Sequence, residues 1–588
     1  MAFQTMNVIE KNIHRKDAQN AKPVSQNSAI IFFFAFFAPL RRLFYIFSQR
    51  TPVKRALMVF SSMTFLTLFL PIVLSGYCLC FFPAIGRFSP DFHRMISNCF
   101  LLAASLVFYF WGEGWRVWVL AASCIVNFLL ARAMMLHITV SRKAAGRPAY
   151  IFTCCDQLQP GGSRTKSQRS LLVIAIVLNL GCLAYFKYFN FFMENIAGIF
   201  PPQWKMTEWT RVVLPLGISF FTFESISYII DVYRGDAPAE KNIINFSCYL
   251  TMFQHLVAGP VIRYRDLYDQ LTQRTLSRSQ FASGARRFIL GLSKKVLIAN
   301  TVAVIADKAF ELPPHELTLS TAWLGLVCYT LQIYYDFSAY SDMAIGLARM
   351  FGFEFLENFN YPYFADSAQD FWRRWHMSLS TWFRDYLYIP LGGNRKSSWH
   401  TYLNLLFVFF LCGLWHGASW VFVAWGLYHG FFLVIERLLT RGRHRPNIST
   451  TGGKWGLSLL CHGYAVLMAM GGWVLFRSDT FAHAWGYYGA LIGNCEGSGK
   501  ANTIWFYYAW DVHIAILAGT LFSLPILPAL AQWWSKRVRQ YTATEKTMAG
   551  VILFSMEFGR TVVLLSLLLL CFLPLASGTY NPFIYFRF

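Results

Sequence analysis

The chain has 588 residues, of which 56% are hydrophobic and only 14% are charged. Its net charge of +23 invites a nucleic-acid-binding interpretation, but the basic residues lie in short gaps between long apolar runs, which argues against nucleic acid as a partner. The composition instead predicts a membrane protein whose basic loops face acidic lipid headgroups.

The first 57 residues form an N-terminal extension. Residues 1–28 are polar, and no small-residue cleavage site follows a proper apolar core, so we predict no signal peptide. The apolar patch 29–40 is too short to span a bilayer and is followed by Arg41 and Arg42. This patch therefore predicts an interfacial helix on the cytoplasmic leaflet.

From Met58 to Phe588 the apolar runs alternate with short loops, which predicts one all-α polytopic membrane domain over 58–588. Roughly eleven to thirteen spanning or re-entrant helices are expected. Four runs are long enough, or nearly so, to cross the bilayer: 58–82, 171–192, 403–425 and 561–575. Basic clusters mark expected cytoplasmic loops: 41–55, 142–169, 437–445 and 536–539. The adjacent Cys154 and Cys155 lie in one of these loops, so we expect them to be reduced.

The run 329–350 carries two aspartates, Asp336 and Asp342, and we interpret it as a broken membrane segment. Charges at membrane depth are expensive, so both carboxylates must face protein or water. They could join helices through a buried hydrogen-bond network, or they could take part in chemistry or an ion path.

The densest polar segment is 358–396. Within it, a helix over 370–382 would place Trp372, Trp375, Leu379 and Trp382 on one face, with His376 nearby. An imidazole titrates near neutrality and can accept a proton from a hydroxyl, so His376 is the first candidate for a catalytic base. A buried histidine can also be only a hydrogen-bonding core residue.

A second histidine, His416, lies in an apolar run with three glycines that would let helices or a ligand approach the backbone: Gly413, Gly417 and Gly426. We interpret His429, near the end of this run, as a packing residue. In the polar segment before it, Arg373, Arg374 and Arg384 could bind phosphates of a nucleotide-like donor or anchor cytoplasmic loops.

Several function classes lack their motifs. The chain has no G-x-S-x-G elbow, no P-loop, no H-E-x-x-H, and no cysteine or histidine spacing that would hold zinc. We therefore predict no metal site, and a membrane transferase and a transporter remain.

Three motifs resemble the membrane-bound O-acyltransferase family, in its bacterial, alginate O-acetyltransferase-like branch: FWRRWHMSLSTWFRDYLYIPLGGNR at 371–395, GLWHGASW at 413–420 and WGLYHG at 425–430. The similarity covers nearly the whole chain after residue 57. Ala339 stands where the family usually has glycine, a change that we expect to be neutral.

The resemblance implies a helical core with re-entrant helices around a central funnel, in the inner membrane of a bacterium. It implies that His376 is catalytic and that His416 is the second family histidine. It further implies acetyl-CoA as a cytoplasmic donor that is not tightly bound, with its phosphates near Arg373 or Arg374. The implied partners are a periplasmic accessory acetyltransferase and, indirectly, a polysaccharide acceptor.

The segment NPFIYFRF at 581–588 resembles a terminal tyrosine motif of related acyl-transfer systems. Tyr585 is accordingly a candidate acyl relay, although a short aromatic tail can also serve only as an interface anchor. Two alternatives stay open for the whole chain. One is the transfer of D-alanine or another acyl group to teichoic acid, lipid or protein, and the other is ion-coupled transport.

Overall fold

The computed structural model describes residues 58–584, except for 82–88, 143–147, 155–156, 200–209, 441–450, 496, 498–499, 501–502, 545 and 579. Residues 58–588 form one compact unit, which is the subject of the following description. The N-terminal extension 1–57, with the interfacial helix expected at 29–40, lies outside the described residues, and so does Tyr585.

The first helices follow local capping signals. Helix α4 begins after Ser89, whose side chain accepts a hydrogen bond from the Phe92 backbone, and Pro90 occupies the first turn. Helix α6 begins with a capping box between Thr165 and Gln168. The elements of this region are η1 Phe65–Phe69, α3 Leu70–Phe81, α4 Pro90–Glu113, η2 Gly114–Arg116, α5 Val117–Met134, α6 Lys166–Leu183, η3 Ala184–Tyr188 and α7 Phe189–Ile199.

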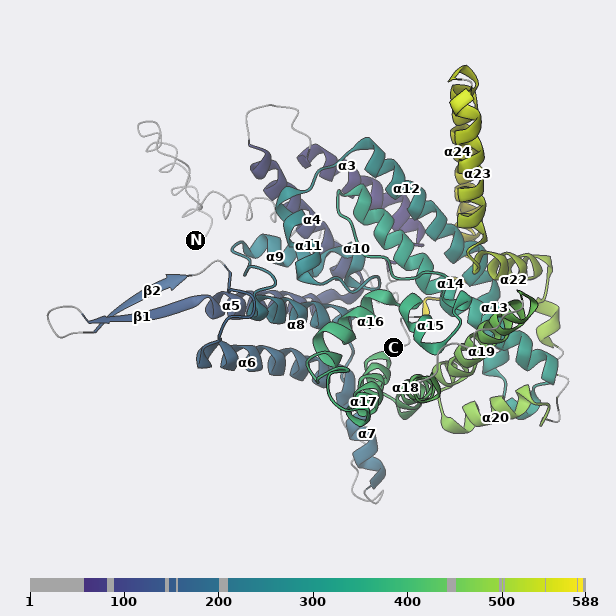
Figure 1. Cartoon of the computed structure of the whole chain (residues 1–588), viewed down its shortest axis with the longest axis horizontal. Coiled ribbons are helices and arrows are strands. Elements are labelled where there is room, and N and C mark those ends of the chain that lie inside the picture. The colour runs from purple at the N-terminus through teal and green to yellow at the C-terminus, as the bar shows by residue number, and fades with distance from the viewer. Residues whose placement is uncertain are drawn as a thin grey trace, which may run out of the picture. The chain divides into compact units, whose positions relative to one another are not determined.

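An antiparallel hairpin follows α5 and overlaps the start of the segment 142–169, which was expected to be a basic loop. Strand β1 is Leu136–Arg142, strand β2 is Pro148–Cys154, and Leu136 pairs with Cys154 (Figure 1). This two-stranded ribbon contains the only strands in the described part of the chain. The prediction of an all-α membrane fold is confirmed in every other described region.

The central helix of the fold is α14, Leu319–Met350, which packs against α12 and α13 (Figure 1). The prediction that 329–350 is a broken segment is wrong, because α14 continues through both aspartates without interruption. Cations on neighbouring helices pair with both carboxylates, as described below. The elements around α14 are α8 Ile218–Arg234, α9 Ile243–Thr251, α10 Phe253–Leu256, α11 Tyr264–Gln273, α12 Arg278–Ser293, η5 Lys294–Ala299, α13 Asn300–Glu311 and η6 Pro314–Glu316.

After α14 the chain forms short, interrupted helices and then longer ones. The elements are η7 Pro362–Phe364, α15 Ala368–Arg374, α16 Met377–Phe383, η8 Arg384–Tyr388, α17 Ser398–His416, α18 Trp420–Thr440, α19 Thr451–Arg477, α20 Phe481–Leu491, η9 Ile504–Tyr507, α22 Trp510–Phe522, α23 Ile526–Thr544 and α24 Lys546–Ala576. Helices α17 and α18 pack against each other, and so do α23 and α24, which project together from the rest of this unit (Figure 1).

Among the described residues, seven helices are long and apolar enough to cross a membrane, or eight if the bent pair α22 and α23 forms one span. They include the predicted runs 171–192 and 561–575. The prediction of one span over 403–425 is wrong, because the chain breaks between α17 and α18. The run 58–82 contains only a shorter apolar helix, Phe65–Phe81.

Buried side chains form two clusters that both include residues of α14. The first cluster joins α14 to α3, α4, α8 and α9, and the second joins it to α13, α15, α16, α18 and α19. Helix α14 therefore fixes the position of the interrupted helices α15 and α16 relative to the N-terminal half of the domain.

Candidate active site

His376 lies at a break between α15 and α16, so the prediction of a continuous helix over 370–382 is wrong. Its backbone is left-handed, with a φ of 45°, a conformation that side-chain-bearing residues rarely adopt. The backbone of the preceding loop replaces the helical hydrogen bonds lost there. The Met377 N–H donates to the Asn358 carbonyl at 2.9 Å, and the Asn360 N–H donates to the Arg374 carbonyl at 2.9 Å. A tertiary contact therefore produces this break.

The His376 side chain is 1% exposed and packs edge-on against Phe337, with ring centroids 4.6 Å apart. Its Nδ1 lies 3.0 Å from Asn358 Oδ1. Its Nε2 has no hydrogen-bond partner among the described residues. One nitrogen of the ring is thus held by the protein, and the other is buried without a hydrogen-bond partner among the described residues, which leaves it available as a base.

His416 is the last residue of α17, and Gly417 continues with extended backbone. Its ring packs against the rings of Trp415, Trp425 and Phe476, with centroid distances of 4.8, 4.9 and 5.3 Å. The Trp415 ring also lies 6.1 Å from the His376 ring. One indole therefore links the two predicted site histidines.

Carbonyl groups at the end of α17 receive side chains from η3, which lies in the predicted run 171–192 but whose residues were not predicted to belong to the site. The buried Lys187 ammonium donates to the Trp415 carbonyl, and the Tyr188 hydroxyl donates to the Leu414 carbonyl at 2.8 Å. A helix end leaves such carbonyls without partners, and a cation is favourable beside them. The signal for Lys187 was available, because a lysine inside an apolar run is a functional candidate by default.

The glycines around His416 allow close contact between α17 and α18, as predicted. A Cβ at Gly426 would lie 2.1 Å from the Phe409 carbonyl oxygen, and one at Gly413 would lie 2.3 Å from that of Phe422. His429, predicted to be a packing residue, is fully buried, with the rings of Trp372 and Trp425 each 5.1 Å away.

Two large cavities meet next to His376, and the Met377 side chain lines both. One cavity, of about 1420 Å³, is lined on this side by Trp372 and Leu379. The other, of about 1680 Å³, is lined by Ser341 and Asn358. Met377, which follows His376 in the chain, thus forms a partition between two spaces, each large enough for a small-molecule ligand, and His376 itself lines neither cavity.

The predicted phosphate-binding arginines differ in their placement. Arg373 lines the 1420 Å³ cavity together with Arg384 and Arg437. Arg374 lines neither cavity, and its guanidinium pairs with Asp370 at 2.7 Å. Of the two residues predicted first, only Arg373 is placed to meet a ligand there. No three His, Cys, Asp or Glu side chains are grouped as metal ligands in the described part of the chain.

The two aspartates of α14 are paired with cations. Asp336 is 2.6 Å from the Lys295 ammonium, and Asp342 is 2.6 Å from that of Lys294 and 2.8 Å from Arg287. Asp336 Oδ2 also accepts the Ile584 N–H at 2.8 Å, which ties the C-terminal segment to the core. These contacts favour the interpretation in which Asp336 and Asp342 join helices through buried polar contacts.

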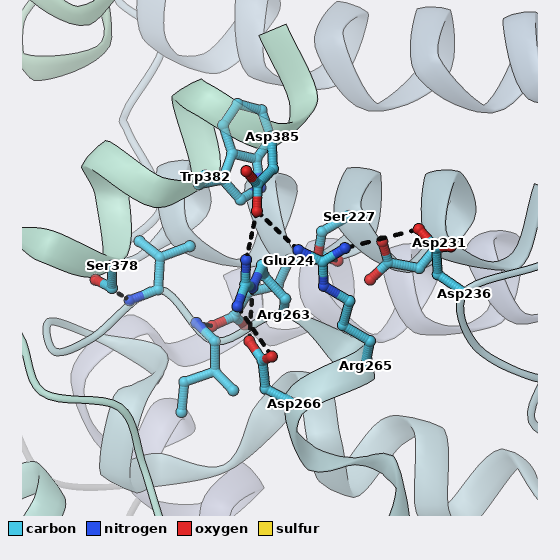
Figure 2. A network of polar contacts seen from close by, with 12 residues as sticks. Glu224, Ser227, Asp231, Asp236, Arg263, Arg265, Asp266, Ser378, Trp382 and Asp385 are labelled. Carbon is cyan, nitrogen blue, oxygen red and sulfur yellow. Dashed lines mark hydrogen bonds and ion pairs between the residues drawn. The ribbon is translucent and has the colours of Figure 1, made fainter. Parts of the chain in front are cut away.

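A second polar network joins the loop after α10 and the start of α11 to η8 (Figure 2). Asp385 pairs with Arg263 and Arg265, each at 2.7 Å, and Arg263 also pairs with Asp266. Burial alone would raise the pKa of Asp385, but the Arg384 hydrogen bond and the charges of Arg263 and Arg265 hold it below its usual range. This network fixes the end of α16 relative to the loop.

The fold and the candidate site define a polytopic membrane protein with two histidines in one aromatic cluster, next to Met377, which lines two cavities. Residues 237–460 match the family model described as "MBOAT, membrane-bound O-acyltransferase family". A protein of Azotobacter vinelandii named "Probable alginate O-acetylase AlgI" is 44% identical over 437 residues, which are 74% of this chain and 78% of the relative.

A protein of the same name from Pseudomonas putida is 39% identical over 542 residues, which are 90% of this chain and 100% of the relative. The "Peptidoglycan O-acetyltransferase" of Helicobacter pylori is 32% identical over 465 residues, which are 74% of this chain and 80% of the relative. The chain belongs to the membrane-bound O-acyltransferase family, and it is a multi-pass membrane enzyme that transfers acyl groups.

Proposed function

We propose that this enzyme moves an acetyl group from cytoplasmic acetyl-CoA across the inner membrane of a bacterium, for O-acetylation of an extracytoplasmic polysaccharide. The observation that carries the proposal is that Met377, which follows His376 in the chain, lines both cavities and forms a partition between them. An acetyl group is small enough to be handed through such a partition, whereas the strongly anionic coenzyme stays on its own side.

The cavity with the arginines is the proposed donor site. Arg373, Arg384 and Arg437 line it, and guanidinium groups match the phosphate oxygens of coenzyme A. Glu436 also lines this cavity, but its carboxylate accepts the Ala368 and Gln369 N–H groups at the start of α15. Its charge is therefore partly engaged with a helix N-terminus and opposes the anionic donor less.

In the proposed reaction, His376 Nε2 takes the proton of an acceptor hydroxyl as its oxygen attacks the thioester carbonyl carbon. The new C–O bond forms, the C–S bond breaks, and the CoA thiolate leaves with the electron pair and receives the proton. His416 promotes this attack from the same aromatic cluster. The acceptor hydroxyl belongs either to Tyr585 or to a periplasmic accessory acetyltransferase that then esterifies the polymer.

The names of the relatives support alginate or peptidoglycan as the class of final acceptor, and cellulose is a further candidate polymer. Transfer of D-alanine or another acyl group is the alternative within the family, and labelled donors distinguish it from acetylation. The ion-coupled transporter alternative relied on Asp336 and Asp342, and the cations paired with both aspartates now weaken it.

The first test uses purified full-length enzyme in lipid nanodiscs with radiolabelled acetyl-CoA. We expect His376→Ala to lower the release of free CoA by about 10²–10⁴-fold, the usual contribution of a general base. His513→Ala, which removes an exposed histidine in α22, should retain full activity. Full acetyl transfer by folded His376→Ala enzyme would refute the role of this residue. With the same enzyme reconstituted into closed lipid vesicles, label uptake without CoA release would favour transport.

A further inference from the structure

Asn358 is a buried residue of the loop after α14, and four hydrogen bonds hold its side-chain amide. Its Oδ1 lies 3.0 Å from His376 Nδ1 and also accepts from Ser378, from Oγ at 2.9 Å and from the backbone N–H at 3.4 Å. Its Nδ2 donates to Ser341 Oγ at 2.9 Å. The Asn358 backbone carbonyl accepts the Met377 N–H, so the same residue also stabilises the break that presents His376.

Two backbone N–H groups determine which atoms donate and which accept in the hydrogen bonds among Ser378, Asn358 and His376. Ser378 Oγ accepts a hydrogen bond from the Val261 N–H at 2.9 Å (Figure 2). The Ser378 hydroxyl is therefore free to donate its own hydrogen onward to Asn358. The Ser378 N–H also points to the amide of Asn358, and an N–H can face only an acceptor. The Asn358 atom facing His376 is therefore the carbonyl oxygen.

A carbonyl oxygen only accepts hydrogen bonds, so the His376 Nδ1 beside it must carry the hydrogen. The neutral ring then has its lone pair on Nε2, the nitrogen without a described hydrogen-bond partner. This is the tautomer in which Nε2 can act as a base. A hydrogen-bond acceptor at Nδ1 also fixes the orientation of the imidazole ring and increases the basicity of Nε2, as in other histidine sites.

We infer that Asn358 is a positioning residue that selects the Nδ1–H tautomer of His376 and aims Nε2 at the substrate, and that Ser378 orients Asn358 for this task. The inference rests on the proposed role of His376 as the base. Asn358 acts entirely through His376, although it also lines the 1680 Å³ cavity. The titratable side chains around the shared Trp415 ring include Lys187 and His416.

The test compares Asn358→Ala, Asn358→Asp and Ser378→Ala in nanodiscs, with CoA release measured from pH 5 to 9. We expect Asn358→Ala to lower kcat by about 10–100-fold with little change in the KM for acetyl-CoA. Asn358→Asp keeps the acceptor and adds a negative charge that favours the imidazolium, so it should retain more activity and move the acidic limb of the pH profile to higher pH. Ser378→Ala should give a smaller loss in kcat.

Asn404→Ala is the matched control, because it removes a partly buried asparagine of α17 whose amide makes only long hydrogen bonds of 3.5 Å. Wild-type kcat and an unchanged pH profile in folded Asn358→Ala would overturn the inference. If Asn358→Ala does not fold, the Asn358→Asp variant tests the inference instead. An unchanged pH profile of CoA release in that variant would overturn the inference equally. Full activity of His376→Ala would instead refute the proposed function itself, and the two failures are therefore distinguishable.

Discussion

The two site histidines lie at two helix breaks that are stabilised in different ways. At His376 the backbone is left-handed, and a neighbouring loop supplies both the backbone hydrogen bonds and the side-chain partner of the ring. At His416 the backbone is ordinary, the ring packs among aromatic side chains, and Lys187 holds the preceding carbonyl. Hydrogen bonds position the His376 ring at the first break. Aromatic packing and the Lys187 ammonium at the helix end position the His416 ring at the second.

The largest effect is expected from removing the Lys187 ammonium beside His416, which tests whether this cation is needed to position the ring. Lys187→Met keeps the length of the side chain but leaves the Trp415 carbonyl without its donor. We expect acetyl transfer to fall by about 100-fold, because displacements of about 1 Å near the chemistry can cost this much. The pH profile should keep its shape, since His376 and Asn358 are untouched.

CoA release measures this effect, and Lys166→Met serves as the control because it removes an exposed lysine at the start of α6. Unchanged activity in the Lys187 variant would mean that Lys187 is not needed to position His416.

A smaller effect is expected from tightening the contact between α17 and α18. Gly426→Ala would place a Cβ 2.1 Å from the Phe409 carbonyl oxygen, so the helices must separate. We expect a loss of about 1–3 kcal/mol in the free energy of unfolding, as for other overpacked sites. Thermal unfolding in nanodiscs measures it, and Gly456→Ala, with no neighbouring atom within 4 Å of the added Cβ, should be silent. An equal melting temperature for both variants would contradict the close helix contact.

The smallest effect concerns the network around Asp385. Its pKa is lower in the folded protein than in the unfolded chain, so the carboxylate stabilises the fold above about pH 4, and this contribution is lost as the pH falls through the folded pKa. Asp385→Asn should therefore cost about 1 kcal/mol at pH 7 and nearly nothing at pH 3. Thermal unfolding at both pH values checks this.

Asp236→Asn is the control for this network, since Asp236 lies 3.6 Å from Arg265 alone. A cost at pH 3 as large as that at pH 7 would show that Asp385 acts by packing and not by charge.

The sequence predicted the family and the membrane class, because both depend on local composition or on continuous motifs. The roles of His376 and His416 stay predictions from those motifs. The sequence failed at the two breaks. Trp372, Trp375, Leu379 and Trp382 follow helical spacing, but the loop at Asn358 interrupts the helix there. The run 403–425 is apolar throughout, and the carbonyl partners at its break come from η3, more than 200 residues earlier in the chain. Breaks that depend on distant partners leave no local signal.

The carboxylates of α14 illustrate the same limit. The sequence placed Asp336 and Asp342 at membrane depth, which is why an ion path remained an alternative. Their partners Lys294 and Lys295 stand more than 40 residues earlier, and only the packing of η5 against α14 brings them together.

The partition between the two cavities has a consequence for the ion gradients across the membrane. A membrane enzyme with a space on either side of its reactive centre must not become a leak for protons or ions. The side chain in that wall belongs to Met377, which is apolar and can change rotamer without breaking a hydrogen bond, while its backbone N–H stays bound to Asn358. Under the proposed function, such a side chain would let an acetyl group pass and would separate the two cavities between turnovers.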